Sequence, residues 1–403
     1  MSVGGTAGRA DASYGDGEAR YGDGEVPYED GRAPYRGGEA PYEDGEARYE
    51  DAGVPYDDAE VPYERDGQRP AVLVLRALGL GDLLTAVPAL RALRRGFPRH
   101  EIVLAAPERL TEVARATGAV DRLLPTHATG REVPAALEWR GPPPDLAVDL
   151  HGCGPLSHRL LQRLAPGGLW AFGHAELPGL VAPRWRPDEH ERERWCRLLR
   201  WHGLDADPGE LRIPPPPVAS PVPGAVVIHP GADAPARRWP VDRFAAVAAS
   251  AREAGHPVVV TAGRGEGPQA RAVAERAGLP AAAVIGGRED VPFPELCALV
   301  ATARCVVVGD TGLAHLASAL GTPSVVLFGP VAPLLWGPPA DGPHRALWRP
   351  SPGDDPLRPG DAHGVVPDPR LLRITVDEVR EAVRALTADT GLEAGKAPAR
   401  ALP

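Results

Sequence analysis

Asp310, Thr311 and Gly312 stand where a helix is predicted to begin directly after a buried strand. The run from 306 is β-branched and apolar, breaks at Gly309, and continues with small and apolar residues at helical spacing. We expect the side chains of Asp310 and Thr311 to cap this helix. The free N–H groups from Thr311 to Leu313 would then point beyond the strand, where Gly312 permits close approach and the helix dipole favours an anion such as a diphosphate. An ordinary capped turn without a ligand is the alternative.

Asp82 occupies a similar place nearer the N-terminus. A buried strand is predicted at 71–75, a glycine-rich loop runs from Arg76 to Gly81, and an amphipathic helix follows from 82 to 98. Open α/β sheets bind ligands outside the carboxyl ends of their strands, so the Asp82 carboxylate is a candidate reactive group; a helix cap is the alternative. The loop is not a dinucleotide-binding fingerprint, because Leu84 replaces its third glycine. His151 follows a strand at 145–150, where substrate binding and capping are equally compatible with the sequence.

Strands and helices alternate through most of the chain, which predicts two α/β domains with parallel sheets. Further strands are expected at 101–105, 121–124, 225–232, 257–263 and 282–285, and further helices at 107–117, 155–164, 191–204, 241–254, 268–277, 293–302 and 377–386. We expect a tail at 1–69, a first domain at 70–207, a proline-rich linker at 208–223, a second domain at 224–349, an extension with a closing helix at 350–387, and a second tail at 388–403.

The N-terminal tail carries the acidity of the chain. Residues 1–69 hold 18 acidic and 7 basic residues, while the remainder is nearly neutral. All eight tyrosines fall here at a seven-residue spacing. Recurrent glycine and proline exclude a coiled coil, so we expect the tail to be disordered, as we do for 388–403. The heptads could make weak multivalent contacts with partners that the sequence does not identify, or they could have no selected role.

The composition indicates where in the cell the protein is expected to work. The four cysteines show no C-x-x-C pairing, which is typical of a reduced, cytosolic protein with small buried thiols. No apolar run approaches the ~20 residues that span a bilayer, and the N-terminus lacks the pattern of a signal peptide. The segment 191–204 predicts a basic helix, either a core helix with an arginine-rich outer face or a surface that meets an anionic membrane. We therefore expect a cytoplasmic protein, with peripheral contact at the inner face of a membrane as the second possibility, and no nucleic-acid partner.

Three motifs occur in a characteristic order. They are G-L-G-D-x-L-x-x-x-P-A-L-R-A-L at 79–93, I-H-P-G-A at 228–232 with R-R-W-P at 237–240, and G-D-T-G-L-A-H-L-A-x-A-L-G-T-P-x-V-x-L-F-G-P from 309, followed by W-G-P at 336–338. Together they resemble glycosyltransferase family 9, whose best-known members are the ADP-heptose:lipopolysaccharide heptosyltransferases. The resemblance covers residues 70 to about 387. It implies a GT-B fold, in which two Rossmann-like domains face a cleft, with the acceptor mainly on the N-terminal domain and the nucleotide sugar on the C-terminal one.

The resemblance also implies roles for single residues. Asp82 matches the aspartate regarded as the base that deprotonates the acceptor hydroxyl, and an inverting displacement needs one carboxylate opposite the leaving diphosphate. Asp310 matches the aspartate that holds the donor sugar. Thr311 and Gly312 match positions whose backbone meets the diphosphate, and His315, one turn on, would support this loop.

Two further donor-side residues follow from the resemblance. Glu266 matches a glutamate that binds the nucleotide ribose, and Arg237 stands where many relatives have a lysine near the leaving phosphates. On the acceptor side the candidates are Gly81 and His151. The family uses no metal, so the resemblance implies no cofactor besides the nucleotide-diphospho-sugar co-substrate.

The function expected is transfer of a sugar, most simply heptose from ADP-heptose, with inversion, to a hydroxyl of a glycan, glycolipid or natural-product acceptor. A non-catalytic nucleotide-sugar-binding module with a partner-recruiting tail and a nucleotide-sugar epimerase are the alternatives. The Pro- and Gly-rich stretch at 350–369 departs from the family pattern, as does the repeat tail.

Overall fold

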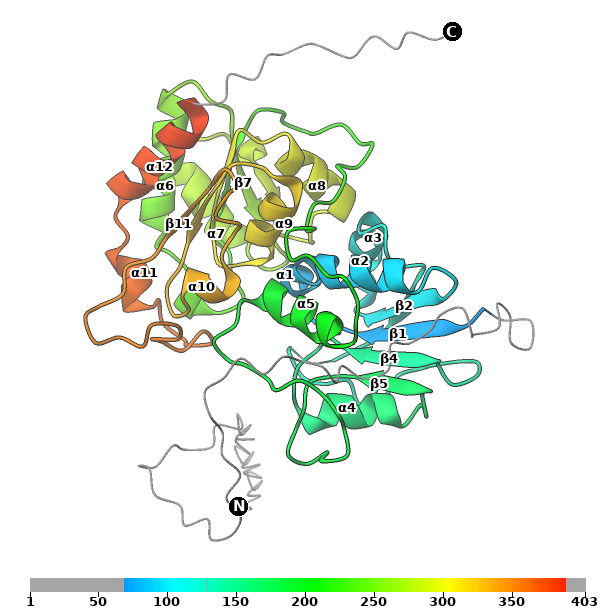
Figure 1. Cartoon of the computed structure of the whole chain (residues 1–403). Coiled ribbons are helices and arrows are strands. Elements are labelled where there is room, and N and C mark those ends of the chain that lie inside the picture. Colours follow the sequence, from blue (N-terminus) through cyan, green and yellow to red (C-terminus); the bar gives the residue numbers. More distant parts are fainter. Residues whose placement is uncertain (1–68, 129, 389–403) are drawn as a thin grey trace, which may run out of the picture. The chain divides into compact units, whose positions relative to one another are not determined.

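The computed structural model describes residues 69–128 and 130–388, which contain two parallel β-sheets flanked by helices (Figure 1). The predicted tail at 1–69 lies outside the described residues except for Arg69, and the predicted tail at 388–403 lies outside them except for Ala388. The expected fold class, two parallel-sheet α/β domains, is confirmed.

The first sheet has the strand order β3-β2-β1-β4-β5. Its strands are β1 (Ala71–Leu75), β2 (Glu101–Ala106), β3 (Arg122–Pro125), β4 (Leu146–Asp149) and β5 (Gly168–Trp170). The associated helices are α1 (Leu80–Thr85), α2 (Val87–Gly96), α3 (Thr111–Ala116), α4 (Pro155–Gln162) and α5 (Glu191–Trp201). The strand order reverses between β1 and β4, which is the position where sheets of this kind bind ligands.

The second sheet has the order β11-β10-β9-β6-β7-β8 and reverses between β6 and β9. Its strands are β6 (Val226–His229), β7 (Val258–Ala262), β8 (Val284–Gly286), β9 (Cys305–Gly309), β10 (Ser324–Leu327) and β11 (His344–Leu347). Its helices are α6 (Val241–Glu253), α7 (Gly267–Arg276), α8 (Phe293–Ala301), α9 (Gly312–Leu320), α10 (Pro333–Trp336), α11 (Pro369–Arg373) and α12 (Val376–Ala388).

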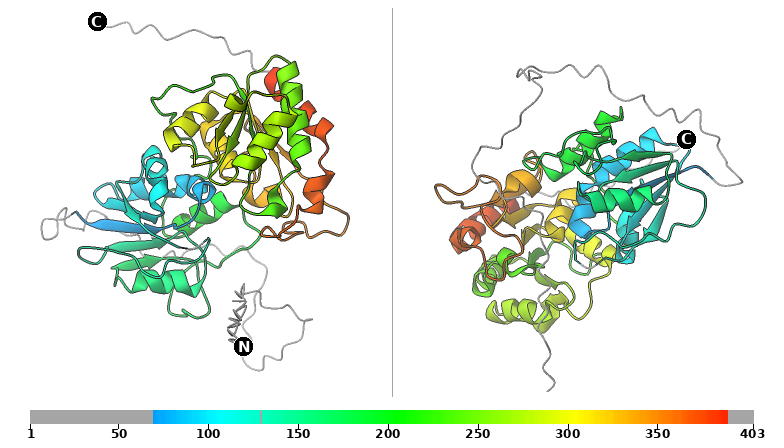
Figure 2. Two further views of the ribbon diagram at one scale, coloured as in Figure 1. Left: turned by 180° about the vertical axis from the view of Figure 1, so that it is seen from behind. Right: turned by 90° about the horizontal axis from the view of Figure 1, so that it is seen from below.

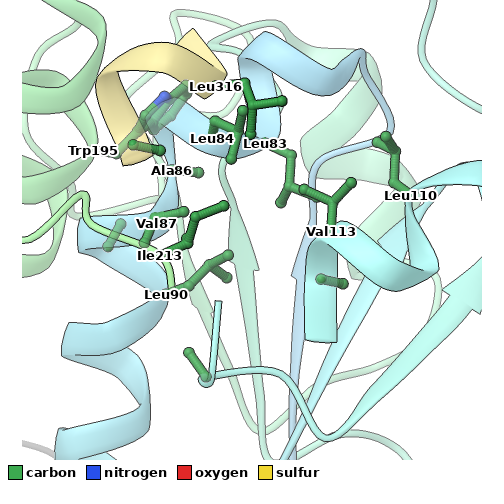
Figure 3. Packing of buried hydrophobic residues seen from close by; sticks show 14 of the residues in the cluster. Leu83, Leu84, Ala86, Val87, Leu90, Leu110, Val113, Trp195, Ile213 and Leu316 are labelled. Carbon is green, nitrogen blue, oxygen red and sulfur yellow. The ribbon is translucent and has the colours of Figure 1, made fainter. Parts of the chain in front are cut away.

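A single hydrophobic cluster joins the two sheets. Alternate residues of β1 point to opposite faces, so that Leu73 packs with α4 while Val72 packs with α1 and α2. Helices α1 and α9 pack against each other, and the views of Figure 1 and Figure 2 agree on this contact. Figure 3 shows Leu316 of α9 among Leu84 of α1 and Trp195 of α5, all members of that cluster. The carboxyl ends of β1 and β9 are thereby held close together.

The predicted elements need several corrections. The helix expected at 82–98 begins earlier, at Leu80, and is interrupted at Ala86, because Pro88 lacks the N–H that would continue the hydrogen-bond ladder. The helix expected at 107–117 is a 3₁₀ turn at Glu108–Leu110 followed by α3. No prediction was made for five short elements: β5, β10, β11, α10 and α11.

The structure tests two predictions from the sequence, one about the cysteines and one about the basic helix at 191–204. All four cysteines are free, and three of them are buried. Helix α5 is a core helix: Trp195, Leu198 and Leu199 are buried, and Arg194 and Arg197 pair with neighbouring glutamates. No helix among the described residues is long and apolar enough to cross a membrane.

Candidate functional site

Two glycines bring the ends of the two sheets into contact. A Cβ on Gly81 would lie 2.6 Å from Cδ2 of His315 and 3.3 Å from Cα of Gly312. A Cβ on Gly312 would lie 3.1 Å from Cβ of Leu80 and 3.3 Å from the Gly81 nitrogen. The space that a Gly312 side chain would occupy is therefore filled by the first turn of α1. The glycines allow the first turns of α1 and α9 to touch.

Asp82 lies in the first turn of α1 with its carboxylate almost fully buried. Arg131 donates to both carboxylate oxygens, at 2.9 Å to Oδ1 and 3.2 Å to Oδ2, and the Gly79 N–H donates to Oδ2 at 3.2 Å. Burial raises the pKa of Asp82, but Arg131 and Arg76 outweigh burial and hold the pKa below its usual value. The group is thus an ionised carboxylate. The bond from Gly79 also gives Asp82 the capping role considered as its alternative.

A cluster of buried charged side chains contacts the backbone of Asp82. Arg76, at 0% exposure, donates to the backbone oxygen of Asp82 at 2.6 Å, to Oγ1 of Thr85 at 3.2 Å and to Oε1 of Glu191 at 2.9 Å. Glu191 also accepts from Arg194 and from the indole N–H of Trp195. The sequence analysis did not single out Arg76, Glu191 or Arg131. Arg76 stood in the loop after a buried strand, which is the one signal that could have identified it.

Asp310 follows β9 and lies close to Asp82. Burial raises the pKa of Asp310 to about 6; Arg237 opposes this rise and the Asp82 carboxylate adds to it. Arg237 donates from Nη1 to the backbone oxygen of Asp310 at 2.9 Å, while its Nε is buried without a partner among the described residues. Arg237 therefore contacts the turn at Asp310.

The first turn of α9 differs from the sequence expectation. Thr311 occupies the cap position, but no side chain caps the helix. The Thr311 hydroxyl is buried and has no hydrogen-bond partner among the described residues. The expectation that Asp310 and Thr311 cap α9 was therefore wrong, and Leu313 packs into the interior. An uncapped first turn leaves N–H groups of the helix available to an anion.

Glu266 lies between the ends of β6 and β7. Its Oε2 accepts the Gly263 N–H at 2.8 Å, and it approaches Nε2 of His229 to 3.9 Å. A Cβ on Gly231 would lie 2.1 Å from Oε2 of Glu266, so only glycine fits at that position with the carboxylate where it is. Glu266 thus lies at the carboxyl edge of the second sheet, the same edge as Asp310.

Two histidines lie beside these carboxylates. His315 packs its ring edge-on to Trp336, and burial lowers the pKa of His315 to about 4, so its imidazole is neutral. Both ring nitrogens of His151 are buried without a partner among the described residues, and burial lowers its pKa. Asp82 and Arg131 are among the charges that act on His151, which places its imidazole near the same group. The structure thus gathers Asp82, Gly81, Asp310 and the two histidines; Glu266 lies further along the edge of the second sheet.

Comparison with known proteins agrees with the motifs. Residues 217–347 match the model of glycosyltransferase family 9 (heptosyltransferase), which confirms the family resemblance. Lipopolysaccharide heptosyltransferase 3 of Escherichia coli is 33% identical over 115 residues, or 28% of this chain. This alignment spans only 33% of the length of that curated relative.

Solved structures share the whole fold. A family 9 glycosyl transferase from Veillonella parvula matches with a TM-score of 0.63 and 19% identity over 80% of this chain and 98% of that one. The ADP-heptose lps heptosyltransferase II of E. coli matches with a TM-score of 0.61 and 20% identity over 79% of this chain and 98% of that one. The two-domain GT-B arrangement is therefore confirmed. Within the described ranges, no three His, Cys, Asp or Glu side chains are grouped so that they could hold a metal ion.

Proposed function

We propose that this chain, whose residues 217–347 match the model of glycosyltransferase family 9, is an inverting glycosyltransferase. It would move a sugar from a nucleotide-diphospho-sugar to a hydroxyl group of a glycan, glycolipid or natural-product acceptor. The observation that carries the proposal is the meeting of Asp82 and Asp310 at the touching first turns of α1 and α9. One carboxylate then comes from each sheet, as a reaction between two substrates held on two domains requires.

In the proposed reaction, Asp82 takes the proton of the acceptor hydroxyl as its oxygen attacks the anomeric carbon. The bond from this carbon to the diphosphate breaks on the opposite face, and the nucleoside diphosphate leaves. Asp310 holds the sugar, and Arg237 with the uncapped first turn of α9 stabilises the charge on the departing phosphates. Arg131 has to release Asp82 first, because the ion pair lowers the basicity of the carboxylate. Half of the Arg131 side chain is exposed, so it can move into solvent.

We propose heptose as the sugar and ADP as the nucleotide, because two of the three relatives named above are heptosyltransferases and one of these is named for ADP-heptose. The N-terminal domain (70–207) would hold the acceptor, and the C-terminal domain (224–349) would hold the donor, with the ribose on Glu266. The site uses no metal in this proposal, and the protein would act in the cytoplasm, in peripheral contact with the membrane when its acceptor is a glycolipid.

Calorimetric titration with ADP-heptose in EDTA tests this proposal, with UDP- and GDP-sugars in parallel. We expect ADP-heptose alone to bind, and Asp310→Ala to weaken it. Asp377→Asn, at an exposed carboxylate on α12, is the matched control and should bind normally. If a different nucleotide sugar binds, the proposed glycosyltransferase activity stands and heptose is rejected as the donor sugar. If no nucleotide sugar binds, the proposed function is rejected. Acceptor-dependent release of ADP, lost in Asp82→Asn while donor binding persists, would separate an enzyme from a binding module.

A further inference from the structure

A cavity of about 470 Å³ lies apart from Asp82 and Asp310, which do not line it. Its walls come from the start of α5, residues 208–212, the C-terminal half of α9, and residues 339–344 before β11. This volume is in the range of small-molecule sites, roughly 300–1,000 Å³. Because the walls belong to both sequence halves, an occupant would contact both.

Two arginines face this cavity without a counter-ion. Arg192 and Arg212 line the wall, and neither guanidinium makes an ion pair or a hydrogen bond with any residue between 69 and 388 that the structure describes. Burial lowers the pKa of Arg192, so its charge is partly removed from water. Arg192 is half-buried, and an unpaired cation that has lost solvent is unfavourable, so a bound anion would relieve that cost; Arg212 is exposed and adds a second positive charge. Arg212 lies over Gly321, at the negative end of α9.

In the described part of the chain, the other charged or titratable residues of the cavity wall form no ion pair with Arg192 or Arg212. Glu193 pairs with Arg200 at 2.6 Å. Asp341 is exposed and makes no ion pair within 4 Å with a described residue, but it is close enough for its negative charge to raise the pKa of Arg192 in opposition to burial. Burial, Arg212 and Arg192 together lower the pKa of His344 to about 4, so both guanidinium groups act on this one neutral imidazole. Two positive charges are thus concentrated on one side of the cavity.

We propose that this cavity is a second anion-binding site, which takes a small molecule carrying phosphate groups. Guanidinium groups match phosphate oxygens with paired, charge-assisted hydrogen bonds. The wall also holds Ser318, whose hydroxyl donates to the Ala314 carbonyl oxygen at 3.0 Å. Ser318 follows Gly312 on the same helix by about 9 Å along the axis. A ligand in the cavity would therefore contact α9, the helix whose first turn is the proposed donor site. The site itself does not depend on the proposed function.

Calorimetric titration of the full chain with inorganic pyrophosphate tests the site. We expect Arg192→Gln and Arg212→Gln each to weaken binding at least about tenfold, the loss of a charge-assisted hydrogen bond. Asp341→Asn should strengthen binding, because it removes the one unpaired negative charge of the wall. A variant that merely damaged the structure would not bind more tightly. Arg109→Gln, an exposed arginine elsewhere, is the control.

Pyrophosphate could also occupy the proposed donor turn, so the titrations are repeated in Arg237→Gln and compared with ADP-heptose. If pyrophosphate binding is unchanged in both cavity variants and in Asp341→Asn, the second site is refuted, while ADP-heptose binding still decides the proposed function separately. If ADP-heptose fails to bind but pyrophosphate binding depends on Arg192, the second site stands and the proposed donor falls. Titration with malonate separates a phosphate site from a general anion site: equal affinity would overturn the assignment to phosphate.

Discussion

The buried cluster behind Asp82 allows a quantitative test through Glu191→Gln. This substitution keeps the shape of the side chain and removes its charge. Arg76 is completely buried, and of the two described carboxylates that it approaches, Glu191 lies at 2.9 Å and Asp82 at 3.9 Å, where Asp82 is already paired with Arg131. Removing one partner of a buried ion pair costs about 3–5 kcal/mol, because the other charge stays behind uncompensated. We therefore expect the free energy of unfolding to fall by about this amount.

Urea denaturation followed by tryptophan fluorescence measures this loss, since the indole N–H of Trp195 donates to Glu191 at 3.0 Å. With an unfolding entropy of roughly 2.1 cal/mol/K per residue, a folded part of this size loses about 1.5 °C per kcal/mol, so Tm should fall by about 4–8 °C. The matched control is Glu210→Gln, whose partner Arg95 lies 2.6 Å away in an exposed pair, where the expected loss is about 0–1 kcal/mol. A loss in Glu191→Gln no larger than in this control would refute the reasoning that the cluster is held by charge.

Three further predictions concern the proposed reaction. Asp82→Asn should lower kcat by about 10²–10⁴-fold, the usual worth of a general base, without changing the Kd of the donor; an unchanged kcat would remove the base role. Gly231→Ala would place a Cβ 2.1 Å from the Glu266 carboxylate and displace it, so calorimetry should show donor affinity falling to that of Glu266→Ala; normal affinity would exclude Glu266 from binding. Burial raises the pKa of Asp310 to about 6, so its charge is lost as the pH falls through 6, and donor affinity should drop about tenfold from pH 7 to pH 5. The Asp310→Asn variant should bind the donor equally well at pH 7 and at pH 5. If its donor affinity still changed with pH, the titrating group would be a residue other than Asp310.

The sequence predicted the fold well because its signals are local. Apolar runs such as 71–75 and 305–309 are buried on both faces, and helical spacing follows each of them. Strand ends are also local, which is why Asp82 and Asp310 could be placed at the carboxyl edges of their sheets. Strand β11 escaped prediction because His344–Leu347 lies at the sheet edge and has no apolar run.

The surroundings of the candidate site could not be predicted from local pattern. Arg76 and Glu191 are 115 positions apart, and only the completed fold brings them to 2.9 Å. Arg131 comes from a segment without a helix or strand, so nothing near it in the sequence points to Asp82. The packing of Gly312 against the first turn of α1 could not be predicted either, because the two segments lie more than two hundred residues apart.

The hydrophobic cluster that the two sheets share limits how far the two domains can rotate apart and whether each can fold alone. Leu84 and Leu316 belong to one continuous interior that runs from the first sheet to the second. A wide rotation of one domain away from the other would expose this interior to water, at roughly 25 cal/mol for each Å² of apolar surface. Substrates therefore have to enter through shifts of side chains and loops such as that of Arg131. For the same reason, neither half expressed alone would have a closed core, and we expect the two to unfold in one cooperative transition.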